Sequence, residues 1–246
     1  MAEEPNLNEA ILKVEDAHTF IGHHHILQGL SFEARADAVT VLIGRNGAGK
    51  STALRSVMGL LPASQGKIIY TGQEIQKKRP YAIARMGIGF VPEDMGIFAN
   101  LTVEENMRVA MLAEDEATGQ RLERTLDMFR DLKNFWNAQA GILSGGQKQM
   151  LAIARAIVNE TTLLLIDEPS KGLAPIIVDA LIEAINQIKK HSVVVLVEQN
   201  FYMASCVGDY FYILDDGMSV HNGHMAELID DDELKSRYLG ISKTVI

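Results

Sequence analysis

The chain has a single cysteine, Cys206, among its 246 residues, so no internal disulfide can form. Such a low thiol content fits a reducing cytosol. No apolar run approaches the roughly 18 residues that a membrane-spanning helix needs. The segment Met1–Asn6 also lacks the basic and apolar stretches of a signal peptide. We therefore expect a cytoplasmic protein that would work at a membrane only through a partner.

Positive charge is scarce as well. There are 23 Lys and Arg residues against 32 Asp and Glu residues, a formal net charge of −9. This balance disfavours a surface that wraps nucleic-acid phosphates, so we expect no nucleic-acid partner. The apolar share of 47%, by contrast, suffices for a full core, and the length suits one large α/β domain or a core with an inserted subdomain.

The most informative segment is a glycine-rich loop with the pattern G-x-x-x-x-G-K-[ST]. An apolar stretch at 39–43 predicts a buried strand before the loop, and 51–58 predicts a helix after it. Glycines let the backbone N–H groups face phosphate oxygens, and the helix N-terminus adds partial positive charge. Lys50 would reach the β- and γ-phosphates, and the Ser51 hydroxyl would bind Mg²⁺. The candidate nucleotide-binding residues here are Gly44, Arg45, Asn46, Gly47, Ala48, Gly49, Lys50, Ser51 and Thr52.

A second candidate site follows the apolar run 163–166, which predicts a buried strand that ends in Asp167 and Glu168. Ligands of open α/β sheets collect at the C-terminal edge of such strands. Asp167 could hold Mg²⁺ through a water, and Glu168 could polarise the attacking water. Because strands often end in an acid, the pair gains its meaning from the phosphate-binding loop upstream.

The segment Leu143–Gln147, with sequence LSGGQ, is the third motif. Ser144 suits a helix N-cap, and the two glycines permit close approach of the backbone to a phosphate. By itself the segment could be a glycine turn that caps a helix. Its position shortly before the acidic strand indicates a phosphate-binding role instead. Ser144, Gly145, Gly146 and Gln147 therefore join the candidate nucleotide-binding residues.

Alternating segments between Ile11 and Phe32 predict a small antiparallel sheet. The run His23-His24-His25 falls in a turn after Gly22 in this interpretation. Adjacent residues in a loop rarely share one tetrahedral metal, so an exposed turn is favoured over a metal site.

Residues 95–158 lack a clear strand and are rich in helix formers, which predicts a helical insertion. Apolar strands return at 163–166 and 193–197, with a helix expected between them from Pro175 to Lys190. Asp215-Asp216-Gly217 predicts a hairpin turn. Near-continuous apolar strands that alternate with helices imply a parallel sheet covered on both faces.

Together these motifs resemble the ATP-binding-cassette (ABC) ATPase family, over nearly the whole chain. Within that family the chain is most similar to the ATP-binding subunits of branched-chain (hydrophobic) amino-acid importers. The resemblance implies an ATPase that uses ATP and Mg²⁺. The segments that carry the subgroup resemblance are Val91–Glu93, Leu101–Asn106, Pro169–Pro175 and Val197–Asn200.

The implied fold is one α/β ABC ATPase domain over residues 1–246. Its P-loop NTPase (RecA-like) parallel core would comprise 11–94 and 159–246, with an N-terminal antiparallel β subdomain and an inserted helical subdomain at 95–158.

The resemblance also implies a head-to-tail homo- or heterodimer of cassettes. ATP on residues 44–52 of one subunit would be closed over by Ser144, Gly145 and Gly146 of the other, between two helix N-termini. Hydrolysis would open the dimer and move integral-membrane permease subunits, served indirectly by a solute-binding protein. The chain would then sit peripherally on the cytoplasmic face of the inner (plasma) membrane.

Two candidate catalytic-site positions depart from the family pattern. Glu93 stands where many cassettes place a Gln; its carboxylate can still hold Mg²⁺ or a water, or it is an exposed loop acid. Gln199 replaces the usual switch histidine, and it can donate a hydrogen bond to the γ-phosphate but cannot shuttle a proton. The predicted catalytic residues are Glu168, Lys50 and Gln199, and the predicted metal-binding residues are Ser51, Glu93 and Asp167.

The adenine contact departs from the pattern too. The aromatic that stacks on adenine usually precedes a glycine, which here places Ile21 before Gly22. The neighbouring Phe20 could serve instead, or it could belong to the core of the sheet. We expect an apolar and weakly base-selective contact. The segment Ser170–Pro175 also lacks the Asp often found there, which leaves the contact across the dimer to other residues.

The leading hypothesis is an ATPase that energises import of branched-chain amino acids or a similar small solute. The alternative is a soluble regulatory or repair ATPase of the same class, although such proteins usually carry long coiled-coil insertions or two cassettes. A P-loop small-molecule kinase is a third class, but it has no need for Leu143–Gln147. The solute stays unidentified, because a cassette contacts the membrane subunits rather than the cargo.

Overall fold

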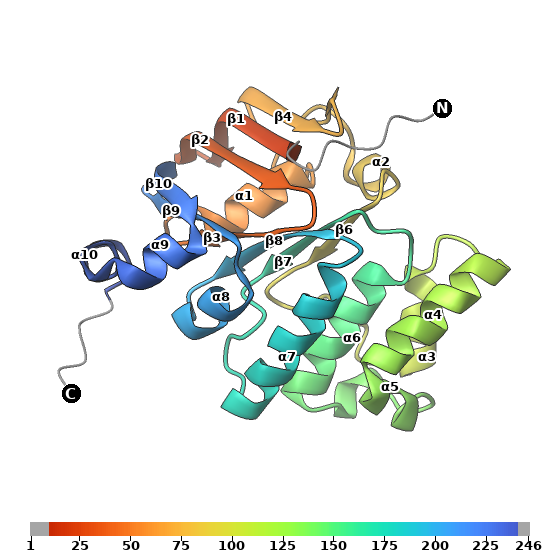
Figure 1. The fold of residues 1–246 in the computed structure, drawn as a ribbon. Coiled ribbons are helices and arrows are strands. Elements are labelled where there is room, and N and C mark those ends of the chain that lie inside the picture. Colours follow the sequence, from red (N-terminus) through yellow and green to blue (C-terminus); the bar gives the residue numbers. More distant parts are fainter. Residues whose placement is uncertain (1–9, 241–246) are drawn as a thin grey trace, which may run out of the picture.

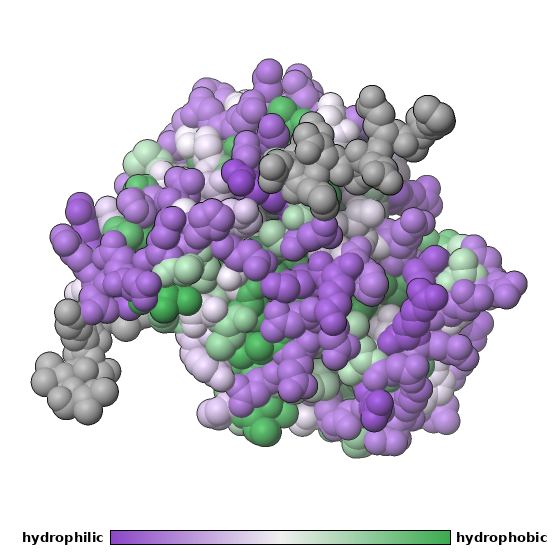
Figure 2. Space-filling model, viewed as in Figure 1, coloured by the Kyte–Doolittle hydropathy of each residue, from purple (hydrophilic) through white to green (hydrophobic). Residues whose placement is uncertain are grey.

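The structure, a computed structural model, describes residues 10–240, so the expectation for Met1–Asn6 lies outside the described residues. Figure 1 shows an α/β fold with two sheets in its upper half and a group of helices in its lower right part. This is the predicted fold class. The face drawn in Figure 2 is mostly hydrophilic, with hydrophobic residues in small scattered groups. Among residues 10–240, no helix combines the length and apolar character required to cross a bilayer.

The central sheet has six strands in the order β10-β9-β3-β8-β7-β6. All neighbouring pairs are parallel except β9 and β10, which form an antiparallel hairpin. The predicted hairpin turn is present, with Asp216 and Gly217 at φ 46° and 76°. The strands are β3 (Val39–Ile43), β6 (Ile88–Val91), β7 (Leu163–Asp167), β8 (Val193–Glu198), β9 (Tyr210–Asp215) and β10 (Met218–His224).

The second sheet is antiparallel and larger than the segment 11–32 predicted, with four strands in the order β2-β1-β4-β5. The prediction that His23, His24 and His25 all lie in a turn was wrong. Gly22, at φ 61°, and His23 suffice for the turn, so His24 and His25 already belong to a strand. Among residues 10–240, no group of three or more His, Cys, Asp or Glu side chains is arranged to hold a metal. The strands are β1 (Ala10–Ile21), β2 (His24–Arg35), β4 (Gln65–Tyr70) and β5 (Gln73–Glu74).

Helices α3 to α6 lie between residues 95 and 158, as the helix-forming composition predicted. Helix α7 ends two residues before the predicted Lys190. These helices are α3 (Val103–Ala110), α4 (Glu116–Met128), α5 (Arg130–Asn134), α6 (Gly145–Ile157) and α7 (Pro175–Ile188). The others are α1 (Lys50–Val57), α2 (Pro80–Ala84), α8 (Phe201–Val207), α9 (Met225–Asp230) and α10 (Asp232–Leu234), with short helical turns η1 (Ala140–Ile142) and η2 (Lys235–Leu239).

Alternate residues of the central strands divide between two hydrophobic cores. Val41 and Ile166 pack with α6, α7 and α8, whereas Leu42 and Leu165 pack with α1 and the antiparallel sheet. Side chains of a strand alternate between its two faces, so both faces of the central sheet are buried. The register pairs Ile43 with Glu198, so the loops that follow β3 and β8 begin side by side. This sheet edge carries the candidate site.

Candidate functional site

The glycine-rich segment 44–52, called the lysine loop below, is shaped by close backbone approaches between β3 and α1. A Cβ on Gly44 would lie 2.3 Å from the carbonyl oxygen of Leu214, so only glycine fits there. Gly49 is the N-cap of α1 with φ 98°, a left-handed conformation that glycine adopts freely. The Lys50 Nζ donates to the Gly44 and Arg45 carbonyl oxygens at 2.9 and 3.1 Å. The loop thus curls around its own lysine.

A pocket of about 340 Å³ opens at this loop. Six of the predicted loop residues line it, whereas Gly44, Arg45 and Ala48 do not. The Arg45 guanidinium donates instead to the carbonyl oxygen of Arg237 at 3.1 Å. The full lining is Ile21, Ile26, Asn46, Gly47, Gly49, Lys50, Ser51, Thr52, Glu93, Glu168 and Lys171.

The Lys50 ammonium is almost wholly buried, with 4% of the side chain exposed. Burial lowers its pKa, and this effect exceeds the opposing attraction of Glu168. The Glu168 Oε1 lies 3.6 Å from the Nζ. Two loop carbonyl oxygens and the Glu168 carboxylate therefore hold the Lys50 ammonium, the group expected to bind the triphosphate.

A candidate metal position lies between α1 and the end of β7. The Ser51 hydroxyl donates to the Asp167 Oδ1 at 2.9 Å. The other carboxylate oxygen, Oδ2, is buried and has no hydrogen-bond partner within residues 10–240. Burial raises the pKa of Asp167 to about 6, against the effect of the Ser51 hydrogen bond. A buried orphan carboxylate oxygen beside a hydroxyl is a donor set that fits Mg²⁺.

This burial predicts a pH dependence that Asp167→Asn should remove. Below about pH 4 the carboxyl is protonated in both the folded and the unfolded chain. Between pH 4 and about 6 the folded chain keeps a proton that the unfolded chain releases, so stability falls as pH rises. Above this range the cost levels off at about 3 kcal/mol.

Urea unfolding in EDTA between pH 4.5 and 8 measures this contribution as the difference between wild type and Asp167→Asn. The control Asp216→Asn, in the exposed β9–β10 turn, should follow wild type. Parallel curves for wild type and Asp167→Asn would refute the assignment of this pH dependence to Asp167.

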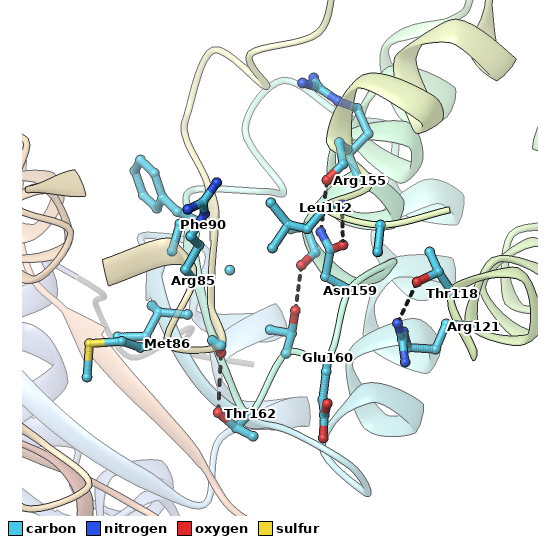
Figure 3. Close-up of a pocket in the computed structure, with 18 of the residues that line it drawn as sticks. Arg85, Met86, Phe90, Leu112, Thr118, Arg121, Arg155, Asn159, Glu160 and Thr162 are labelled. Carbon is cyan, nitrogen blue, oxygen red and sulfur yellow. Dashed lines mark hydrogen bonds between the residues drawn. The ribbon is translucent and has the colours of Figure 1, made fainter. Parts of the chain in front are cut away.

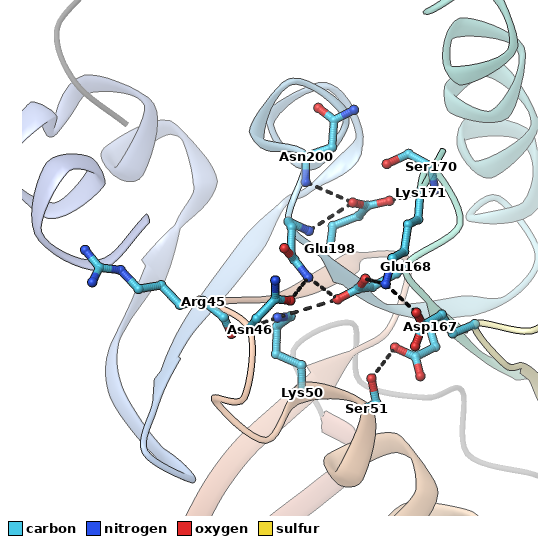
Figure 4. A network of polar contacts seen from close by, with 12 residues as sticks. Arg45, Asn46, Lys50, Ser51, Asp167, Glu168, Ser170, Lys171, Glu198 and Asn200 are labelled. Carbon is cyan, nitrogen blue, oxygen red and sulfur yellow. Dashed lines mark hydrogen bonds and ion pairs between the residues drawn. The ribbon is translucent and has the colours of Figure 1, made fainter. Parts of the chain in front are cut away.

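Glu168 is the centre of the polar network in Figure 4. The Gln199 side-chain amide donates to the Glu168 Oε1 at 2.6 Å and to the Asn46 Oδ1 at 2.5 Å. The predicted catalytic residues Lys50, Glu168 and Gln199 are thereby brought together from β3–α1, β7 and β8. Glu168 has φ 47°, a left-handed conformation that is uncommon for a residue with a side chain.

Sequence reasoning missed Lys171. Its Nζ lies 2.5 Å from the Glu93 Oε1 and 3.6 Å from the Glu168 Oε2, and it lines the pocket. The hydrogen bond to Glu93 and both nearby carboxylates raise the pKa of Lys171. The available signal was Glu93 itself, because a carboxylate in place of an amide calls for a nearby cation.

The two candidates for the adenine contact, Phe20 and Ile21, differ in their position relative to the pocket. Ile21 lines the pocket together with Ile26, which sequence reasoning did not single out. Phe20 lies outside the lining and stacks on His25, with ring centroids 4.2 Å apart and planes at 5°. At 46% exposure, Phe20 is not a core residue of the sheet either.

The segment Ser144–Gln147 begins α6 and does not line this pocket. The Ser144 hydroxyl accepts from the Gln147 N–H, and the Gln147 side chain accepts from the Ser144 N–H, a reciprocal capping box. The first turn of α6 contains no acidic residue. The N-terminus of α6 is thus free of nearby negative charge on its own first turn, and it lies apart from the pocket at the N-terminus of α1.

Comparison with known proteins places these motifs in context. The family described as ABC transporter matches residues 27–171. The chain is 38% identical to the high-affinity branched-chain amino acid transport ATP-binding protein BraG of Pseudomonas aeruginosa, covering 94% of this chain and 100% of that protein. It is 36% identical to the probable branched-chain amino acid transport ATP-binding protein LivF of Archaeoglobus fulgidus, covering 88% and 93%. The lipopolysaccharide export system ATP-binding protein LptB of Escherichia coli is 30% identical over 87% and 91%.

Solved structures agree on the fold. A nucleotide-free ATP-binding cassette from an ABC transporter superposes with a TM-score of 0.83 at 22% identity, covering 96% of this chain and all of that one. An ATP-binding subunit of an ABC transporter superposes with a TM-score of 0.79 at 29% identity, covering 94% and 96%. With the family match, the two transport relatives and the lysine loop beside the acid pair, the chain belongs to the ABC transporter ATP-binding family, whose members hydrolyse ATP.

Proposed function

We propose that this chain is the ATP-hydrolysing subunit of an importer for branched-chain amino acids or a similar small solute. The observation that carries the proposal is the 38% identity to a branched-chain amino acid transport subunit over that protein's whole length. A soluble regulatory or repair ATPase is not favoured, since a second transport relative matches at 36%. The direction of transport is itself proposed, because the ATP-binding protein of an export system is also among the relatives.

In the proposed site, ATP occupies the pocket at the lysine loop. The Lys50 ammonium would exchange its hydrogen bonds to the loop carbonyl oxygens for hydrogen bonds to the β- and γ-phosphates. Ser51 and Asp167 would hold Mg²⁺, with Glu93 in the lining of the same pocket, and the ion would supply positive charge to the phosphoryl group during transfer. Glu168 would accept a proton from the attacking water. Gln199 would donate its side-chain amide to the γ-phosphate, since an amide N–H is already directed at this site.

We further propose that a second cassette completes the site. Ser144, Gly145, Gly146 and Gln147 lie outside this chain's own pocket, which supports a role on the nucleotide of a partner cassette. The exposed N-terminus of α6 would then face the γ-phosphate from the opposite side. The partner is either a second copy or a related cassette.

A groove of about 610 Å³ is the proposed docking place for the membrane subunits (Figure 3). It lies between β6 and the helices α4 and α6, and its lining includes Leu112, which is 63% exposed. The segment after β6 joins this groove to the ATP pocket. Within this segment, Glu93 lines the pocket. Further along it, the Gly96 carbonyl oxygen accepts a hydrogen bond from the Arg155 guanidinium at 2.5 Å, and the Phe98 ring centre lies 5.0 Å from that guanidinium. Movement at Glu93 would therefore reach the groove through the contacts that Gly96 and Phe98 make with Arg155.

Transport by a reconstituted complex tests the proposal. The chain is co-expressed with candidate membrane subunits, placed in liposomes and supplied with Mg·ATP on the cassette side and a loaded solute-binding protein on the other. Labelled leucine, isoleucine or valine should accumulate on the cassette side, and Glu168→Gln should reduce uptake to the ATP-free background. ATP-driven movement in the opposite direction, or no complex with membrane subunits, would contradict import.

A further inference from the structure

Glu198, the last residue of β8, is a buried carboxylate for which the proposed reaction has no use. It is 1% exposed. Its two oxygens accept three backbone N–H groups: Oε1 accepts from Ser170 at 3.0 Å, and Oε2 accepts from Gln199 and Asn200 at 3.0 Å each. Figure 4 shows this carboxylate between Ser170, in the segment after β7, and Asn200, in the segment after β8.

These N–H groups belong to the segments that present the proposed catalytic side chains. Ser170 lies in the turn just after Glu168, and Gln199 is itself the proposed γ-phosphate donor. The Glu168 backbone N–H also donates to the Val197 carbonyl oxygen at 2.9 Å. The end of β8 therefore holds the turn that contains Glu168 at two points. A turn with a non-glycine residue at φ 47° keeps that conformation only where its surroundings impose it.

Keeping a carboxylate at this position is energetically expensive. Burial raises the pKa of Glu198, and the hydrogen bonds from Asn200, Ser170 and Gln199 only oppose that effect. An apolar side chain would avoid the desolvation of a charge, so the carboxylate does not serve packing alone. A side chain with two acceptor oxygens can instead tie two separate turns together, which an apolar residue cannot do.

We infer that Glu198 is a positioning residue for ATP hydrolysis. Its two oxygens fix the turn that presents Glu168 relative to the turn that presents Gln199, so that both side chains meet at one γ-phosphate. The 2.6 Å contact between the Gln199 amide and the Glu168 carboxylate is the geometry that this arrangement maintains. The inference rests on the roles proposed above for Glu168 and Gln199.

Glu198→Ala and Glu198→Gln in the full chain test the inference. Glu198→Ala should lower kcat on the order of 100-fold, because a displacement near 1 Å at reacting groups costs about that much. The affinity for Mg·ATP, measured with a fluorescent ATP analogue, should change by less than about threefold, since Lys50 and the loop are untouched. Glu198→Gln should fall between wild type and Ala, because its amide oxygen accepts on one side while its NH₂ faces a donor on the other.

Asp209→Ala is the matched control for loss of a structural carboxylate. The Asp209 Oδ2 accepts the Val39 N–H at 2.8 Å at the opposite end of β3, far from the phosphate-binding loop. This variant should lower the melting temperature and leave kcat near wild type. If Glu198→Ala and Glu198→Gln keep wild-type kcat, or if kcat and affinity fall together as the melting temperature falls, the inference is overturned.

Glu168→Gln separates this inference from the proposal on which it rests. If Glu168→Gln turns over ATP normally, the assigned role of Glu168 fails, and the role of Glu198 fails with it. If Glu168→Gln is inactive and Glu198→Ala is normal, only the role of Glu198 fails. Should the Ala variant not fold, Glu198→Gln, which preserves volume and one acceptor, decides the question.

Discussion

Glu168→Gln is expected to lower ATP turnover by about 10²- to 10³-fold while leaving nucleotide binding intact. A general base contributes a factor of this size, and the amide cannot accept the proton of the attacking water. The substitution preserves shape, and the amide oxygen can still accept the hydrogen bond that Gln199 now makes at 2.6 Å. Lys50 retains its contacts with the Gly44 and Arg45 carbonyl oxygens.

With hydrolysis blocked, Mg·ATP should hold two cassettes together. Phosphate release and light scattering on the same sample measure both effects. Glu123→Gln, at an exposed position on α4, removes an equal charge and should behave as wild type. Full turnover by Glu168→Gln would refute its role as base. A sample that stays monomeric at high concentration, both alone and with its membrane partners, would refute the two-cassette site.

Gln147→Glu is expected to reduce turnover by about 10- to 100-fold with little loss of stability. Helices α3 and α6 both begin with a capping box, but the third helical residue is Glu105 in α3 and the uncharged Gln147 in α6. A carboxylate in the first turn favours the helix itself and opposes a bound anion at the same end. The neutral residue therefore leaves the N-terminus of α6 attractive to a phosphate.

The reverse change, Glu105→Gln, is the control, because it alters an equivalent cap on a helix for which no phosphate is proposed. It should leave turnover near wild type. Steady-state hydrolysis and thermal unfolding of both variants give the comparison. If Gln147→Glu hydrolyses ATP at the wild-type rate, the N-terminus of α6 does not contact phosphate.

The strands and loops that build the pocket beside Lys50 were predictable because each depends on a local pattern. Apolar runs located β3, β7 and β8, and the spacing of glycine, lysine and serine located the loop between β3 and α1. Helix α7 was predictable from its apolar face and from Pro175 in its first turn. In each case the signal lies within a single short segment.

The missed features depend on contacts between distant segments. Lys171 pairs with Glu93, which is far away in the sequence, and only the meeting of two loops reveals this. Glu198 lies in an otherwise apolar strand, and its role follows from N–H groups on two turns. Ile26 reaches the pocket because β2 folds back on β1. The short strands β4, β5 and β6 were not predicted individually, and β4 and β6 pair with β1 and β7.

The contacts of Lys50 have a consequence for how a triphosphate enters. The ammonium is held by carbonyl oxygens of its own loop and by Glu168, all within one chain. When the nucleotide binds, Lys50 would therefore exchange these protein oxygens for phosphate oxygens as acceptors. Its side chain is already ordered and would not have to be immobilised. The loss of Lys50 rotamer freedom, which would otherwise oppose nucleotide binding, therefore occurs when the protein folds, so less of the attraction between Lys50 and the phosphates would be offset on binding.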